Sequence, residues 1–277
     1  MKLLIVFNPT AGKGDNDAIL NDIKQQIKHQ KLNGDIYLTT GENDDEHIDT
    51  KLSKGNYTHI AAAGGDGTIS MVAKHARQYN LPLGILPIGT SNGLATDLYI
   101  PENPLEAFQV IIDAKFHVNL DTIIVNEKYP LIHLGDVGSN ANLLARDEKS
   151  SDSKIQQALS AIEELKDDND FKYKITTEEG EWEGSASMIS FCNAKRYGTG
   201  IPLTKEGKPN DGFFELVVFE EIQISTLVNS VLAKFDETFL DKENTIIITT
   251  DNATINLKSK HLIQVDGELV GDCDFLS

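Results

Sequence analysis

Three glycines surround a single aspartate in the segment 64–68, which reads GGDGT. A short apolar run ends at Ala63 just before it, and apolar residues at helical spacing follow it from Ile69. Glycine tolerates positive φ and lets backbone N–H groups approach a ligand, so this strand-to-helix turn has the composition of a phosphate site. An acid beside a phosphate makes chemical sense if it binds a cation or handles a proton. Asp66 is therefore predicted to be catalytic, with a helix N-cap as the alternative.

Two further strand-to-helix turns have a related composition. The segment 8–14 reads NPTAGKG and follows the apolar run 3–7. It is not a Walker A loop, because Gly14 stands where Ser or Thr is required, and it lacks the third glycine of a dinucleotide fingerprint. The segment 87–95 reads PIGTSNGLA and again joins an apolar run to a helix start. Three such turns make a phosphate site a better interpretation than a single structural turn does.

The third turn also fits a hydrolase. Its residues 89–93 read GTSNG, which matches the G-x-S-x-G nucleophile elbow in the strand-turn-helix setting that this motif requires. Ser91 would then be the nucleophile, and His261 is the obvious late histidine for a triad. This alternative leaves the two upstream turns unexplained.

Two acidic turns lie further along the chain. The segment 208–213 reads KPNDGF and the segment 264–268 reads QVDGE. Taken by themselves, both are typical of β-hairpin turns.

The elements that must position these turns fall into two groups. The first has four strands alternating with four helices, which predicts an open α/β sheet; the strands are expected at 3–7, 35–40, 58–63 and 83–88 and the helices near 16–30, 45–53, 68–79 and 103–114. The second has alternating, β-branched segments, which predict an antiparallel β-sandwich; these are 116–125, 129–137, 171–177, 181–193, 213–219, 245–250, 253–257 and 261–266. Helices are expected in this part near 154–166 and 223–236. The boundary is expected near residue 120, giving domains 1–120 and 121–277.

Charge and composition exclude some classes of function. The chain of 277 residues has 43 acidic and 25 basic side chains, a formal net charge of -18, and 40% hydrophobic residues. Such an acidic chain argues against nucleic acid as a partner, since phosphates require a basic footprint. Cys192 and Cys273 show no pairing pattern, which indicates a reducing cytoplasm. No membrane-spanning segment is expected, and the N-terminal apolar run is too short for a signal peptide.

The motifs NPTAGKG, GGDGT and PIGTSNGLA, in this order and at these separations, resemble the catalytic domain of diacylglycerol kinases and of the related bacterial lipid kinases and sphingosine kinases. The resemblance is strong over residues 1 to about 125 and continues, in scattered motifs, to the C-terminus. It implies a Rossmann-like, NAD-kinase-like nucleotide-binding domain, a β-sandwich domain for the lipid substrate, and an active site in the cleft between them. The implied reaction transfers the γ-phosphate of ATP to a lipid hydroxyl and depends on Mg²⁺.

The resemblance also implies roles for individual residues. Glu268 matches the family's general base, which accepts the proton of the lipid hydroxyl, and Asp266 would be its partner or a cation contact. A structural Mg²⁺ would be held by the Asp211 carboxylate with the backbone carbonyls of Lys208 and Phe213. Asp121 matches an acid in the water and Mg²⁺ network of bacterial relatives. The residues expected to contact the nucleotide are Asn8, Gly12, Lys13, Thr40, Gly64, Gly65, Asp66, Gly67, Thr68, Thr90 and Asn92.

One departure from the family pattern leaves the lipid open. Many bacterial members carry Asp after the asparagine of the third motif, where this chain has Gly93. NAD kinase or another small-molecule hydroxyl kinase is an alternative of the same fold, although NAD kinases lack the first and third motifs. A catalytically silent lipid- or nucleotide-binding protein is a further alternative, although it would more readily have lost Asp66 or Glu268. The partner expected is a lipid at the inner face of the membrane, and a homodimer is left open.

Overall fold

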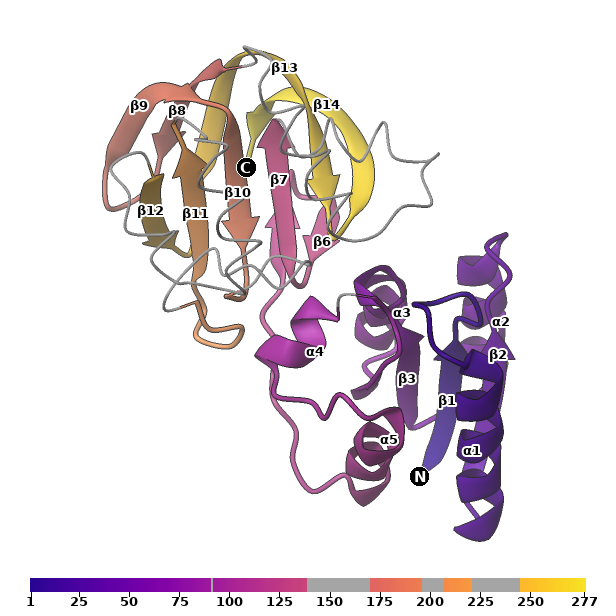
Figure 1. Cartoon of the computed structure of the whole chain (residues 1–277). Coiled ribbons are helices and arrows are strands. Elements are labelled where there is room, and N and C mark those ends of the chain that lie inside the picture. The colour runs from indigo at the N-terminus through magenta and orange to yellow at the C-terminus, as the bar shows by residue number, and fades with distance from the viewer. Residues whose placement is uncertain (91, 139–169, 196–206, 221–244) are drawn as a thin grey trace. The chain divides into compact units, whose positions relative to one another are not determined.

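A computed structural model describes residues 1–90, 92–138, 170–195, 207–220 and 245–277 (Figure 1). The chain divides into two compact units, Met1–Asn119 and Leu120–Ser277. Each unit has a hydrophobic core of its own. The predicted combination of an N-terminal α/β sheet with a C-terminal antiparallel β-sandwich-like domain is confirmed.

The first unit is built on four parallel strands in the order β2-β1-β3-β4. Their bounds are β1 Lys2–Phe7, β2 Asn33–Leu38, β3 His59–Gly64 and β4 Leu83–Pro87. The two central strands, β1 and β3, are apolar almost throughout and buried, as expected for a parallel sheet covered on both faces. Strand β2, which follows β1 in the chain, lies on one side of β1, and β3 lies on the other side. A topological switch point therefore lies between β1 and β3. Ligands of open α/β sheets bind outside the carboxyl ends of the strands at such points.

Five helices accompany this sheet: α1 Asn16–His29, α2 Asp44–Gly55, α3 Asp66–Gln78, α4 Gly93–Asp97 and α5 Pro104–Asp113. Leu20 and Ile23 of α1 and Phe108 of α5 share one core cluster with alternate residues of β1. Helices α2 and α3 contact each other, and an Asp45–His75 hydrogen bond of 2.9 Å joins them. The strand-to-helix turns that carry the three glycine motifs all leave the carboxyl ends of β1, β3 and β4.

The second unit contains an antiparallel sheet in the order β12-β11-β10-β7-β13-β8-β9, with β14 paired to β13, and a separate β5-β6 hairpin. The bounds are β5 Ile123–Val125, β6 Tyr129–Leu131, β7 Leu134–Gly138, β8 Phe171–Thr176, β9 Glu181–Ala186, β10 Met188–Cys192, β11 Phe214–Phe219, β12 Thr245–Thr250, β13 Thr254–Val265 and β14 Glu268–Leu276. Strand β8 alternates buried and exposed residues, so one face of the sheet covers the core.

Several predicted strand bounds were wrong. The strand expected at 116–125 is limited to β5, and the run 129–137 divides into β6 and β7. The run 181–193 divides at Ser187 into β9 and β10. The runs 253–257 and 261–266 belong to one continuous strand, β13. The polar residues 258–260 between them had led us to predict two separate strands. Strand β14 was not predicted, because most of its residues are exposed or polar and Gly271 lies inside it. The helices expected near 154–166 and 223–236 lie outside the described residues.

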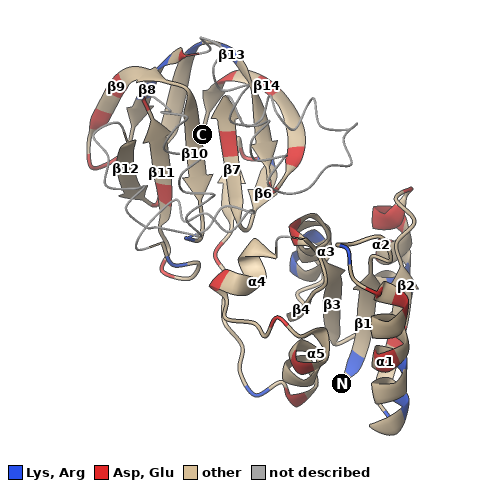
Figure 2. Ribbon diagram, in the orientation of Figure 1, with Lys and Arg blue, Asp and Glu red and all other residues tan. Residues whose placement is uncertain are grey.

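Acidic side chains are spread over both units and outnumber basic ones (Figure 2). Within the part of the chain that the structure describes, no helix is long and apolar enough to cross a membrane. No disulfide joins Cys192 and Cys273, in agreement with the sequence.

Candidate active site

A side-chain contact joins the first glycine motif to the second. Asn8, directly after β1, donates from Nδ2 to Thr68 Oγ1 at 3.2 Å, and its Oδ1 accepts the Thr10 N–H at 3.0 Å. The Asn8 N–H also donates to the carbonyl of Ala63 at the end of β3. The turn after β1 is therefore held against the beginning of α3.

Close backbone approaches join the third motif to both of the others. Gly12 has φ +62°, and a Cβ there would collide with the carbonyl oxygen of Ile88. A Cβ at Gly89 would collide with the Cα of Gly65. The Gly64 carbonyl accepts the N–H groups of Ile88 and Gly89, each at 3.2 Å. The three predicted turns thus meet at the switch point of the sheet, and only glycine fits where they touch.

The second motif leads into the 13-residue helix α3. Its N-cap is Gly65, in an extended conformation, and no side chain caps the helix. The N–H groups of the first turn of an α-helix have no intrahelical partner, and they attract anions together with the helix dipole. A Cβ added at Gly67 would meet no atom within 4 Å, so the backbone is open on that side. This end of α3 fits a phosphate group.

Asp66 occupies the centre of this arrangement. Its Oδ2 accepts the Gly93 N–H at 3.0 Å and its Oδ1 accepts the Leu94 N–H at 3.1 Å. The carboxylate therefore caps a helix, as the alternative interpretation proposed, but the helix is α4 and not its own. Each carboxylate oxygen has about two acceptor sites, so a second site on each oxygen is available to a cation. The capping role and the cation role are compatible.

Asn92 shapes the third turn instead of pointing away from it. It has φ +54°, its Oδ1 accepts the Gly89 N–H and its Nδ2 donates to the Gly89 carbonyl, both at 3.0 Å. A cavity of about 280 Å³ lies beside this turn, lined by Pro87, Thr90, Asn92, Ala95, Thr96, Ile100 and Glu102. Ser91, the nucleophile of the hydrolase interpretation, lies outside the described residues.

Thr40 lies just after β2, where Asp44 organises the turn. The Asp44 carboxylate accepts the N–H groups of Thr40 and Gly41 at 2.9 and 2.8 Å and the Tyr37 hydroxyl at 2.6 Å. Burial, the strongest single influence, raises the pKa of Asp44, but these hydrogen bonds together outweigh it and leave the pKa lowered. Burial and the bond to Asp44 raise the pKa of Tyr37 to about 12. Sequence reasoning missed Asp44, although an acid at the start of a helix was a signal for it.

The DGE segment is a two-residue hairpin between β13 and β14. Asp266 and Gly267 have φ +49° and +86°, as in a type I′ turn, and Glu268 is the first, exposed residue of β14. The Asp266 carboxylate accepts three backbone N–H groups, from residues 132, 133 and 134, at 3.0 to 3.1 Å. Asp266 therefore anchors this turn to the beginning of β7.

Two carboxylates accept hydrogen bonds from the backbone of the 208–213 turn, where a structural Mg²⁺ is predicted. One of them belongs to the turn and the other comes from outside it. Asp211 Oδ1 accepts the Phe213 N–H at 3.1 Å, and Asp121 Oδ2 accepts the Gly212 N–H at 2.7 Å. No group of three or more His, Cys, Asp or Glu side chains with metal-binding geometry occurs among the described residues. The predicted set of one carboxylate and two carbonyls, from Lys208 and Phe213, does not require such a group, and oxygen donors of this kind suit Mg²⁺.

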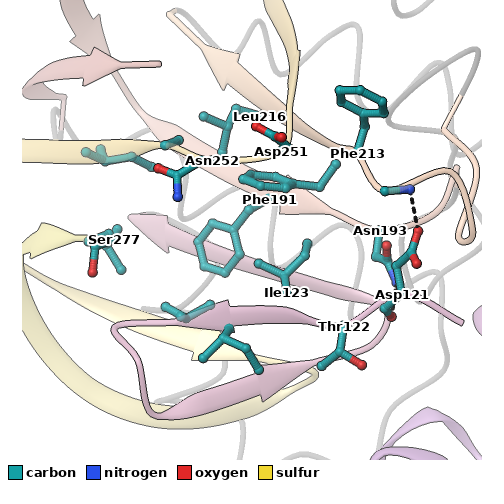
Figure 3. A pocket seen from close by; sticks show the side chains of 17 residues that line it. Asp121, Thr122, Ile123, Phe191, Asn193, Phe213, Leu216, Asp251, Asn252 and Ser277 are labelled. Carbon is teal, nitrogen blue, oxygen red and sulfur yellow. Dashed lines mark hydrogen bonds between the residues drawn. The ribbon is translucent and has the colours of Figure 1, made fainter. Parts of the chain in front are cut away.

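A second pocket, of about 290 Å³, opens beside Asp121 (Figure 3). Its walls include Ile123, Phe191 and Leu216. Asn193 donates from Nδ2 to the Asp121 carbonyl at 2.8 Å and to the Ile132 carbonyl at 3.0 Å, which fixes Asp121 relative to the bend between β6 and β7. The apolar walls and the polar edge are of the kind that small-molecule sites use.

The chain matches the models of two known domain families. Residues 2–121 match the model of the diacylglycerol kinase catalytic domain, and residues 134–276 match that of the YegS C-terminal NAD kinase beta sandwich-like domain. The chain belongs to the diacylglycerol kinase family. It is 26% identical over 284 residues to the lipid kinase YegS of Escherichia coli K12, covering 98% of this chain and 91% of that protein. It is 27% identical over 242 residues to a protein of Klebsiella pneumoniae strain 342 named "Probable lipid kinase YegS-like", covering 83% and 78% of the two chains.

The fold of this kinase also matches a solved structure. A crystal structure of a diacylglycerol kinase from Bacillus anthracis str. Sterne superposes with a TM-score of 0.74 at 21% identity, over 99% of this chain and 92% of that one.

The hydrolase interpretation does not agree with membership of a kinase family. His261, the histidine of that interpretation, lies in β13. The centroids of the Phe171 and His261 rings are 4.5 Å apart, Ser259 contacts His261 Nε2 at 2.8 Å, and burial lowers the pKa of His261.

Proposed function

We propose that this kinase transfers the γ-phosphate of ATP to a hydroxyl group of a lipid, such as diacylglycerol, a related glycerolipid or a sphingoid base. The observation that carries the proposal is the meeting of three glycine turns around Asp66 at the switch point of a parallel sheet. Membership of the diacylglycerol kinase family and the names of the YegS-type relatives support the choice of a lipid as acceptor.

The first unit is proposed to bind the nucleotide. The N–H groups at the start of α3 would hold the phosphates, and the residues of the other two turns would enclose them. Lys13 is exposed at the rim of the first turn and would neutralise phosphate charge. Thr40, held by Asp44, would contact the nucleotide after β2. Mg²⁺ bound by Asp66 would neutralise charge that develops on the transferred phosphoryl group.

The second unit is proposed to supply the base and the lipid site. The Glu268 carboxylate accepts the proton of the lipid hydroxyl as its oxygen bonds to the γ-phosphorus, while the bond from that phosphorus to the bridging oxygen of ADP breaks. A positioned base of this kind contributes about 10²- to 10⁴-fold in rate. Asp266 holds the hairpin that carries the base. The turn around Asp211 would hold a structural Mg²⁺, with the carbonyls of Lys208 and Phe213 and with Asp121 nearby.

The enzyme would act in the cytoplasm, where ATP is available, and reach its lipid by peripheral contact with the inner face of the membrane. The formal charge of -18 makes an anionic surface unfavourable on average, so a local patch or a bound cation would have to mediate that contact.

The test is to incubate the protein with γ-labelled ATP, Mg²⁺ and a total lipid extract and to separate the products. Label is expected in a lipid that moves as its phosphorylated form. Label in added NAD, with none in lipid, would instead support the small-molecule kinase. ATP binding without labelling of any acceptor would support a silent binding protein.

A further inference from the structure

We propose that Gln264 is a positioning residue for the general base and that Asp136 fixes the orientation of its amide. This inference rests on the proposed function, in which Glu268 is the base. Gln264 lies in β13 and Asp136 in β7, directly opposite each other in the register of the two strands. Opposite residues of an antiparallel pair project on the same face, so their side chains can meet.

These two side chains form a buried chain of hydrogen bonds that ends at the DGE hairpin. Gln264 Nε2 donates to Asp136 Oδ2 at 2.5 Å, and Gln264 Oε1 accepts the Gly267 N–H at 2.7 Å. Gln264 is 2% exposed and Asp136 is 0% exposed. Gly267 immediately precedes Glu268, so the chain of hydrogen bonds ends one residue from the base.

The acid determines which way the amide faces. The two ends of a glutamine amide have nearly the same shape but opposite hydrogen-bonding character. A carboxylate acceptor opposite Gln264 favours the orientation in which Nε2 faces Asp136. That orientation leaves Oε1, the only acceptor of the amide, facing the Gly267 N–H. In the reverse orientation Oε1 would face the Asp136 carboxylate oxygen, and the amide NH₂ group would face the Gly267 N–H. Neither pair can form a hydrogen bond, and a buried polar group without one is costly.

The hairpin is consequently tied to one segment at two points. Asp266 is held by the N–H groups of residues 132–134, and Gly267 is held through Gln264 by Asp136 of the same segment. The backbone entering Glu268 thus has its position set by β7 and the residues before it. Catalytic groups lose efficiency when their supporting residues allow small displacements, so this support is expected to act on the chemical step.

The test combines Gln264→Leu with the Glu268→Gln variant. With an intact base, Gln264→Leu is expected to lower kcat for lipid phosphorylation about tenfold or more, with little change in the KM for ATP. In the Glu268→Gln background the same substitution is expected to cost little further, because a positioning residue acts through the base. A fold loss that is equally large in both backgrounds would overturn the inference and indicate a purely structural role.

Matched variants keep the result interpretable. Ser190→Ala is the control, because Ser190 lies opposite Asp136 in β10, is 0% exposed, and has a hydroxyl with no hydrogen-bond partner within the described ranges. The Ser190→Ala variant is expected to retain kcat within about twofold.

Asp136→Asn is the second test, to be used if Gln264→Leu does not fold. It keeps the size of the side chain but removes the carboxylate that orients the Gln264 amide, and it is expected to lower kcat. A wild-type protein that labels no lipid would overturn the proposed function, whereas an active wild type with fully active Gln264→Leu and Asp136→Asn variants would overturn this inference alone.

Discussion

At the scale of single residues, Asp66 has an observed role as a cap of α4, and a catalytic role is proposed for it. The sequence presented these two roles as alternatives. The Asp66 carboxylate accepts the N–H groups of Gly93 and Leu94 and so orders the third turn. This gives a reason why a chain with Gly93 in place of the family's Asp can keep its site in order. Gly93 contributes its backbone N–H, which any residue except proline could provide, while the negative charge comes from Asp66.

Asp66→Asn is expected to lower the rate of phosphoryl transfer by more than about 100-fold. The amide keeps one acceptor oxygen for α4 but loses the charge that binds the cation. Because one backbone N–H loses its acceptor, we also expect a loss of stability of about 1 kcal/mol. Labelled product and melting temperature should be measured on the same preparation. Transfer at close to the wild-type rate would contradict the role of Asp66.

Asp44 gives a prediction about pH. Its pKa in the folded protein lies below the ordinary value of 3.8, so the carboxylate stabilises the fold above that pH, and the contribution is lost as pH falls through the folded pKa. Asp44→Asn should therefore be less stable than wild type at pH 7, with a difference that shrinks as the pH falls below 3.8 and through the folded pKa. Glu46→Gln, an exposed neighbour, is the control. Urea unfolding at pH 7 and over a series of lower pH values measures the difference, and a constant gap would contradict the assignment.

At the scale of elements, the site depends on how closely three turns approach one another. Gly12 and Gly14 lie in the same turn, but only Gly12 has positive φ and faces a neighbouring carbonyl, that of Ile88. A Cβ at Gly14 would meet no atom within 4 Å. Substitutions at these two positions therefore distinguish the loss of the contact between the turns from the mere loss of a glycine in the first turn.

Gly12→Ala is expected to destabilise the protein by about 1–3 kcal/mol and to weaken ATP binding, because the first turn must move away from the third. Gly14→Ala is expected to leave both nearly unchanged. Thermal unfolding and a nucleotide-binding titration compare the two. Equal effects of the two substitutions would show that the turns are not held by this contact.

The sequence predicted the elements that carry the site better than the contacts between them. Apolar runs followed by glycine turns were enough to place the three motifs after β1, β3 and β4. They could not show that Asp66 caps α4 or that Asp266 reaches residues 132–134, because these contacts join segments far apart in the chain. Strand β14 escaped prediction because its pairing with β13, and not an apolar pattern, makes it a strand.

At the scale of the whole molecule, charge sets a condition on how the enzyme meets its lipid. The chain has 43 acidic and 25 basic side chains, and the acidic ones are spread over both units (Figure 2). Anionic lipids give a bilayer a negative surface potential, which repels a protein of this charge over about one Debye length. Salt or a divalent cation weakens that repulsion.

Lipid phosphorylation on anionic vesicles is therefore expected to be slower than on neutral vesicles at low salt, and the difference should shrink as salt rises toward about 0.5 M. The same acceptor lipid at equal surface density is the control for substrate supply. Faster turnover on anionic vesicles at low salt would mean that a local basic patch outweighs the net charge.

The most direct test of the mechanism measures lipid phosphorylation and ATP affinity together in the Glu268→Gln variant. Glu268 is exposed at the start of β14, and glutamine keeps its size but cannot accept the hydroxyl proton. In this variant kcat for lipid is expected to fall about 10²-fold or more while the Kd for ATP stays the same. A variant that turned over normally, or that lost ATP affinity in proportion to its rate, would contradict the assignment of Glu268 as the base.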